Sequence, residues 1–178
     1  MTPVSSAFLV GAALLFSSGA WAQEPKSAPL AKQLATALDA SRSESIAAKD
    51  PSSPDTFVGA LYVPGLELLV VAGKYSAPLL LDERLKKKEY KDTYMDLNGA
   101  ATAGTKVFVE DIGADGLSAK RDGNRIDSFE AAGKRTTFDG DWDKQKLTEA
   151  EYMKIHAGAD DRYSQMLTAL LAQLKKGS

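Results

Sequence analysis

The chain has 178 residues, of which 44% are hydrophobic and 26% charged, and it contains no Cys and one His. This length suits one ordinary domain, and the composition excludes disulfides, a thiolate nucleophile, Cys-ligated zinc, iron–sulfur clusters and a His-rich metal site. The 22 basic and 24 acidic residues leave a net charge of −2, so the charge balance gives no sign of binding to nucleic acid or to an anionic membrane.

Residues 1–22 have the features of a secretory signal peptide. Residues 7–16 (AFLVGAALLF) form an uncharged apolar run, and Ala20-Trp21-Ala22 fits the small-x-small rule for cleavage before Gln23. The run is shorter than the roughly 20 residues that span a bilayer, so we expect removal rather than a retained anchor. An exported chain without Cys is typical of a bacterial periplasm or medium. We therefore expect a periplasmic or secreted product with no membrane attachment.

A flexible, polar lead-in is expected at residues 23–28, followed by a single domain over 29–178. The first helix should cover Pro29–Ala40, because Ser27 can cap it, Pro29 suits its first turn, and leucines recur on one face. The last helix should begin after Thr148, which forms a T-x-x-E capping box with Glu151, and run to about Lys175.

Between these helices the sequence alternates strands with one further helix. The predicted strands are Ser45–Ala48, Thr56–Val63, Leu66–Ala72, Thr105–Asp111 and about Asp127–Phe138, and the further helix is Ser76–Leu97. Pro64-Gly65 favours a type II turn rather than the primed turns of tight hairpins, which predicts a wider loop there. The two strands beside it are apolar on both faces, so their hairpin should be central and covered on both sides.

This order of elements predicts an α+β fold. We expect a mostly antiparallel, split β-barrel-like sheet of about five to six strands, with flanking helices and a long C-terminal helix.

Candidate metal-binding and catalytic residues are few. The acids of Asp139-Gly140-Asp141-Trp142-Asp143 resemble a Ca²⁺ loop, but positions six and twelve of the template fall on Lys144 and Ala150. A solvated loop whose acids favour the start of the next helix is the preferred interpretation, and Asp111–Gly116 is likewise read as a turn. His156 is interpreted as a packed or half-exposed residue rather than a catalytic one, since no serine lies in G-x-S-x-G or S-x-x-K.

Lys74-Tyr75-Ser76 is the most suggestive binding motif. It leaves a buried strand and enters a predicted helix, so the helix-start N–H groups, the Ser76 hydroxyl and the Lys74 ammonium could together meet a phosphate or carboxylate. A plain N-cap explains Ser76 equally well.

The arrangement from Pro29 to Phe138 resembles the flavin-binding split-barrel group, the pyridoxamine-phosphate-oxidase-like proteins. The resemblance is carried by the first helix, by Ser45–Asp50 with the hairpin Phe57–Ala72, by Gly73-Lys74-Tyr75-Ser76-Ala77-Pro78 and by Lys106–Asp111. It implies an FMN phosphate beside Lys74, Tyr75 and Ser76, commonly at a dimer interface. Leu79, Leu80 and Leu81 stand where that group commonly has an Arg-rich stretch.

Two functions follow from these observations. The residues favour an exported domain without a catalytic or metal site and without a cofactor, which binds a small molecule or a partner, or forms a homodimer through its sheet. The alternative, implied by the resemblance, is an FMN-binding oxidoreductase-like protein. A third hypothesis is a Ca²⁺-responsive module that uses Asp139, Asp141 and Asp143.

Overall fold

The structure is a computed structural model that describes residues 24–43, 45–51, 57–74 and 105–177. The predicted signal peptide and the predicted helix Ser76–Leu97 lie outside these described residues. Within them, the elements in chain order are α1 (Ala28–Ala40), β1 (Ser45–Lys49), β2 (Phe57–Val63), the 3-10 turn η2 (Pro64–Leu66), β3 (Leu68–Lys74), β4 (Thr105–Ile112), β5 (Asp127–Ala131), β6 (Lys134–Phe138) and α4 (Glu149–Gly177).

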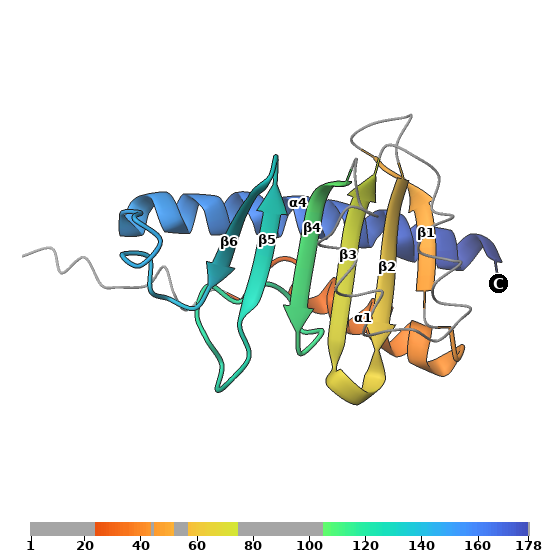
Figure 1. The fold of residues 1–178 in the computed structure, drawn as a ribbon. Helices are drawn as coiled ribbons and strands as arrows, with labels where there is room; N and C mark the ends of the chain where they lie inside the picture. The colour runs from red at the N-terminus through yellow and green to blue at the C-terminus, as the bar shows by residue number, and fades with distance from the viewer. Residues whose placement is uncertain (1–23, 44, 52–56, 75–104, 178) are drawn as a thin grey trace, which may run out of the picture.

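The six strands form one antiparallel sheet in the order β1-β2-β3-β4-β5-β6, so each strand pairs with the next along the chain. The sheet is open, with β1 and β6 at its edges (Figure 1). The predicted α+β class, the antiparallel sheet and the long C-terminal helix are thus confirmed. The strand pairing does not close into a barrel.

The segment predicted as one strand over Asp127–Phe138 is two strands. Ala132 and Gly133 both have positive φ, +52° and +74°, and they connect the pair Ala131↔Lys134. Two residues with positive φ make the primed turn that matches strand twist. The other hairpin has the wider loop expected from Pro64-Gly65, because η2 and the left-handed residue Glu67 separate Val63 from Leu68.

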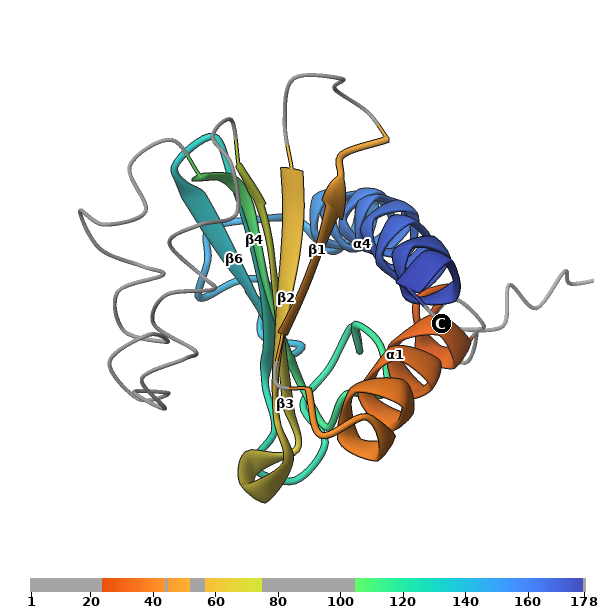
Figure 2. The same ribbon diagram turned by 90° about the vertical axis from the view of Figure 1, so that its right-hand side faces the viewer.

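Both helices pack on the same face of the sheet (Figure 2). Their apolar stripes meet alternate strand residues, and the buried side chains of this core include Leu34, Leu38, Val58, Leu69, Val71, Val109, Phe138, Tyr163, Met166, Leu167 and Leu170. This core places α4 behind the whole sheet, with its first turns near β6 and its closest packing against β1–β3, and beside α1.

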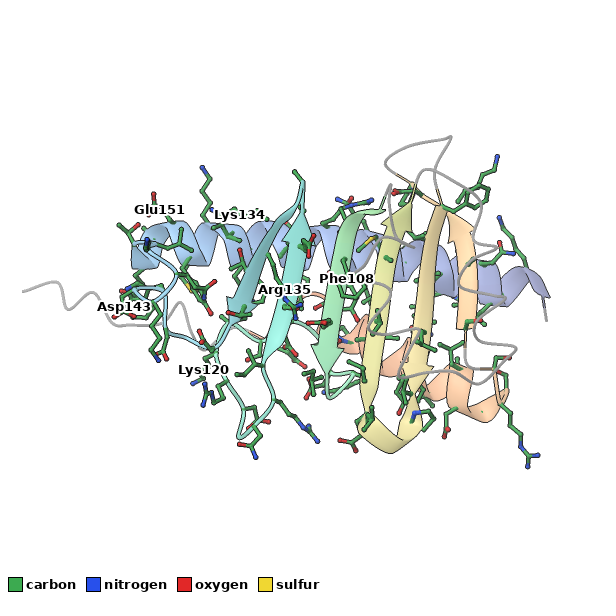
Figure 3. All side chains as sticks on the ribbon, in the orientation of Figure 1. Phe108, Lys120, Lys134, Arg135, Asp143 and Glu151 are labelled. Carbon is green, nitrogen blue, oxygen red and sulfur yellow. The ribbon has the colours of Figure 1, made fainter. Side chains whose placement is uncertain are left out.

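The opposite face of the central strands is also buried. Its apolar residues form a second cluster, namely Leu61, Leu68, Val70, Ala72 and Phe108. The prediction that the β2–β3 hairpin is covered on both sides is therefore confirmed. The same face is polar toward β6, where the buried carboxylate of Glu110 accepts hydrogen bonds from Ser128 and Arg135; Arg135 and Phe108 are labelled in Figure 3.

The capping box at the start of α4 forms as predicted. The Thr148 N–H donates to the Glu151 carboxylate at 2.8 Å, and the Glu151 N–H donates to the Thr148 hydroxyl at 3.2 Å. Figure 3 shows Glu151 and Asp143 at this end of the molecule. Across the described ranges, no helix combines the length and the apolar character needed to cross a bilayer.

The edge of β6 is closed by a side chain. The Gln145 amide accepts from the Thr137 N–H at 3.2 Å and donates to the Thr137 carbonyl at 2.7 Å. One side chain thus occupies a donor and an acceptor that another strand would use, and exposed edges of this kind are sites of unwanted pairing.

Replacing Gln145 with Ala should reopen this edge. We expect a loss of about 1–2 kcal/mol in the free energy of unfolding and self-association that rises with concentration, measured by urea unfolding and sedimentation velocity. Gln173→Ala, at an exposed position on α4, is the matched control. A Q145A protein as monomeric and as stable as Q173A would contradict the edge-blocking role.

Candidate functional site

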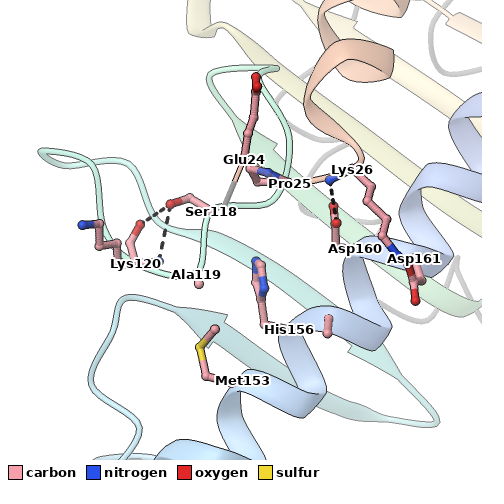
Figure 4. A pocket seen from close by; sticks show the side chains of 11 residues that line it. Glu24, Pro25, Lys26, Ser118, Ala119, Lys120, Met153, His156, Asp160 and Asp161 are labelled. Carbon is pink, nitrogen blue, oxygen red and sulfur yellow. Dashed lines mark hydrogen bonds and ion pairs between the residues drawn. The ribbon is translucent and has the colours of Figure 1, made fainter. Parts of the chain in front are cut away.

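A pocket of about 440 Å³ lies where three separate segments meet. Residues 24–26 form one wall, residues 118–120 form a second, and α4 contributes the third through Met153, His156 and their neighbours (Figure 4). We call residues 113–120, which follow β4, the pocket loop. The pocket depends on how this loop is held, because the loop has no helical or strand hydrogen bonds of its own.

Asp111, the buried residue near the end of β4, holds the first half of the pocket loop. Its carboxylate accepts the N–H groups of Asp115 at 3.1 Å and Gly116 at 2.9 Å. The hydroxyl of Tyr163 on α4 donates to the same carboxylate at 2.9 Å. Burial raises the pKa of Asp111 to about 6, and these three donors oppose the increase. Burial, followed by the neighbouring Asp111 charge, raises the pKa of Tyr163 as well, so it stays a donor.

Asp127, the first residue of β5, holds the two ends of the same loop. One carboxylate oxygen accepts the Ile112 N–H at 2.8 Å, and the other accepts the Ser118 N–H at 2.8 Å. Burial is the main cause that raises the pKa of Asp127 to about 8, and the Asp111 charge adds to it, while the two N–H donors act in the opposite direction. The loop therefore rests on two interacting buried carboxyl groups.

Ser27 and Asp160 join the loop to both helices. The Asp160 carboxylate accepts the Lys26 N–H at 2.8 Å, the Ser27 N–H at 3.0 Å and the Ser27 hydroxyl at 2.5 Å. The same hydroxyl accepts the Leu117 N–H at 3.0 Å. Ser27 thus occupies the predicted N-cap position, but its side chain makes no cap hydrogen bond. The end of the predicted lead-in is bonded to α4, and α1 begins at Ala28.

His156 and Tyr152 complete the frame from α4. The imidazole lies 2.8 Å from the Leu117 carbonyl through Nε2 and packs edge-on against Phe138, with ring centroids 5.0 Å apart. The Tyr152 hydroxyl donates to the Ala119 carbonyl at 2.9 Å and accepts the Gly140 N–H at 3.1 Å. His156 is half-exposed, which confirms its interpretation as a packed residue, and it also lines the pocket.

Lys74, the first residue of the motif predicted to bind a cofactor phosphate, lies at the end of β3 that is away from this pocket. Lys74 ends β3, whereas the pocket loop follows Ile112, which pairs with Leu68 at the other end of that strand. Six residues of strand, roughly 20 Å, separate the two ends. The side chain of Lys74 and all of Tyr75 and Ser76 lie outside the described residues, so the FMN assignment stays a prediction.

The two acidic runs have local hydrogen bonds. Asp139 accepts the Asp141 N–H at 2.9 Å, and Asp141 forms an ion pair with Lys144. The predicted turn Asp111–Gly116 is present, and the Asp111 carboxylate closes it by accepting the N–H groups of Asp115 and Gly116. In the part of the chain that the structure describes, no group of three or more His, Asp or Glu side chains is arranged to hold a metal ion.

Sequence reasoning missed Asp127, Asp160 and the role of Ser27. The sequence does contain a signal for Asp127 and for its neighbour Asp111. Val107, Val109 and Asp111 share one strand face, and so do Asp127 and Phe129. The apolar members of this face enter the core. Acids in an inward register indicate a specific hydrogen-bonding task. Ser27 and Asp160 are 133 residues apart, and no local pattern links them.

Comparison with family models, curated proteins and solved structures gives no match for this chain.

Removing the Ser27 hydroxyl should weaken the junction of α1, α4 and the pocket loop. Ser27→Ala leaves the buried Leu117 N–H without its acceptor, so we expect a loss of about 1–3 kcal/mol in the free energy of unfolding and faster exchange of the Leu117 amide. Ser43→Ala, at an exposed position after α1, is the control. Equal stability of the two variants would contradict this role of Ser27.

Gly116 is required for close approach of the pocket loop to α1. Its φ is +95°, and a Cβ there would lie 2.5 Å from the Ala28 nitrogen. Gly116→Ala should therefore cost roughly 2–5 kcal/mol, measured by urea unfolding. Gly123→Ala shares the positive φ, +59°, but its Cβ would meet no atom within 4 Å, so about 1 kcal/mol is expected. Similar losses in both variants would refute the steric explanation.

Proposed function

We propose that this protein is an exported binding domain that holds a small organic ligand in the pocket beside His156 and catalyses no reaction. The observation that carries the proposal is a pocket of about 440 Å³ built from three chain segments, a size within the range of small-molecule sites. The export rests on the signal-peptide features of residues 1–22.

The hydrogen bonds around the pocket support binding over bond-breaking. The Ser118 hydroxyl donates to the Lys120 carbonyl at 2.7 Å, and the His156 Nε2 bonds to the Leu117 carbonyl. A nucleophile and its base would bond to each other, whereas these two groups each support the backbone of the pocket loop. Walls that are ordered before the ligand arrives reduce the entropy lost on binding.

The lining favours a ligand that is mainly apolar with one polar group. Pro25, Ala119, Met153 and Ala157 supply apolar surface. A carbonyl can only accept, so Nε2 of His156 carries the proton toward Leu117, and Nδ1 of the neutral ring is an acceptor. Five charged residues line the pocket. Lys26 pairs with Asp161 and the Asp160 carboxylate accepts from Lys26 N–H and Ser27, which leaves Glu24 and Lys120 with opposite charges, and Lys120 extends away from His156 (Figure 4). A small alcohol or phenol meets these conditions better than a highly charged molecule.

The single imidazole of the chain gives a direct test. Residues 23–178, labelled with ¹³C and ¹⁵N, would be titrated with phenol, benzyl alcohol and benzoate while the one imidazole signal is followed by NMR. We expect a saturable shift of the His156 signal with phenol or benzyl alcohol. Ala157→Trp, which fills the pocket from an exposed helix position, should weaken that binding at least tenfold.

Ala150→Trp, at an exposed position on α4 outside the pocket, is the matched control and should bind like the parent chain. Absence of a saturable His156 shift with all three probes, or equal binding by the Ala157→Trp variant, would overturn the proposal. FMN serves as a fourth probe: binding that is lost in Lys74→Ala and unaffected by Ala157→Trp would favour the flavin alternative instead.

A further inference from the structure

We propose that the outer edge of β1 is a docking site for an extended segment of another protein, which adds to the sheet as a further strand. The segment alternates acidic residues with apolar residues, and the apolar ones face α4. This surface lies at the opposite edge of the sheet from β6 and is separate from the pocket.

The hydrogen bonds of the sheet determine which main-chain groups of β1 point outward. In an antiparallel pair, successive residues direct their N–H and carbonyl groups alternately toward the partner strand and away from it. The Gly113 N–H donates to the Glu67 carbonyl at 2.7 Å, one step beyond the pair Leu68↔Ile112, and the registers carry this alternation from β3 through β2 to β1. The residues of β1 that direct these groups away from β2 are Ser45, Ala47 and Lys49.

The other edge of the sheet agrees with this alternation. The same registers, followed from β4 to β6, direct the N–H and carbonyl groups of Thr137 outward, and these are the two groups that the Gln145 amide occupies. Among the described residues, none bonds to the outward groups of β1 in this way. The described part of the chain therefore closes one edge of the sheet with a side chain and leaves the other edge able to pair.

The end of α4 extends the packing surface beyond this edge. The helix runs behind the sheet from β6 to β1, and its last turns project past β1 (Figure 1). Ile46 of β1 and Leu174 of α4 are partly buried at the margin of the main core, and Ala48 belongs to that core. In an added strand, the residues opposite Ile46 and Ala48 face the same side as these two. Apolar side chains at those positions would pack against the end of α4.

The exposed charges at the far end of β1 and at the end of α4 are basic. Lys49 is the last residue of β1, and Lys175 and Lys176 lie in the last turn of α4. All three are exposed, and none forms an ion pair with another described residue. Asp50, which follows Lys49, is buried and paired with Arg162. Opposite charges that face each other across strands stabilise the pair, so an acidic segment is favoured.

A second copy of this chain fits the edge less well. Two-fold pairing of β1 with itself would bring the projecting ends of two α4 helices to the same side of the joined sheet (Figure 1). Each end carries Lys175 and Lys176, so like charges would meet. An extended segment has no such helix. It would bind by strand addition, in which main-chain hydrogen bonds supply affinity and alternate side chains supply specificity.

The test is an NMR titration of the ¹⁵N-labelled chain, residues 23–178, with the peptide acetyl-EVEVEVE-amide. We expect saturable shifts of the β1 amides, larger at Ala47 and Lys49, which gain hydrogen bonds, than at Ile46 and Ala48, which already bond to β2. The peptide acetyl-KVKVKVK-amide has the same main chain and the reversed charge, so it should bind roughly tenfold more weakly. Absence of saturable β1 shifts with the acidic peptide, or equal binding of the two peptides, would overturn the proposal.

Two variants test the edge itself. Ala47→Pro removes an outward N–H and leaves the bonds to β2 in place, and Pro is tolerated on edge strands, so we expect a loss of roughly tenfold or more in affinity for the acidic peptide. Lys49→Glu should also weaken this binding. Lys154→Glu makes the same charge change at an exposed position in the first half of α4 and should bind like the parent chain. If Ala47→Pro fails to fold, equal binding by Lys49→Glu and Lys154→Glu still refutes the site.

Two other results would assign the edge or the peptide elsewhere and so overturn the proposal. Shifts of the β1 amides that depend on protein concentration alone, with a dimer in sedimentation velocity, would assign the edge to a second copy. Peptide shifts confined to the pocket loop and lost in Ala157→Trp would place the peptide in the pocket. The peptide assay does not use the pocket otherwise, so a failure of the proposed function leaves it unaffected.

Discussion

The structure depends on one constraint, which is that a backbone segment without secondary structure must find partners for its N–H groups when it packs against a core. The pocket loop meets this constraint with side chains from three other parts of the chain, namely the carboxyl groups of Asp111 on β4 and Asp127 on β5 and the hydroxyl of Ser27 before α1. Buried polar groups without partners cost several times what a hydrogen bond contributes. The position of the loop is therefore fixed by specific hydrogen bonds and not by packing alone.

This way of holding the loop explains why a pocket exists there. Tyr152 and His156 of α4 bond to the carbonyls of Ala119 and Leu117, so long side chains hold the loop against α4 at one wall of the pocket. Residues 24–26 complete the enclosure because Asp160 binds the backbone of Lys26 and Ser27. The pocket thus lies at the junction of the two ends of the domain, and its walls belong to parts of the chain that the sequence places far apart.

The sequence predicted most of the secondary structure because the signals there are local. The apolar runs on either side of Pro64-Gly65 indicated β2 and β3, and the Thr148–Glu151 pair marked the start of α4. The division of residues 127–138 into two strands was missed, since Ala132-Gly133 lacks the Asn or Asp that usually accompanies such turns. The site was harder: the predicted cap role of Ser27 was right in position but wrong for its hydroxyl, which bonds across the molecule to Asp160.

The contact between Ser27 and Asp160 also affects the order in which parts of the domain can fold. Each strand of this sheet pairs with its sequence neighbour, so most of the sheet can assemble progressively as the polypeptide lengthens. The hydrogen bonds between Ser27, at the start of α1, and Asp160 on α4 cannot form progressively, because they join residues 133 positions apart. A chain that folds from its N-terminus onward would leave this junction open until Asp160, in the first half of α4, is available, so α4 is the element that completes the domain.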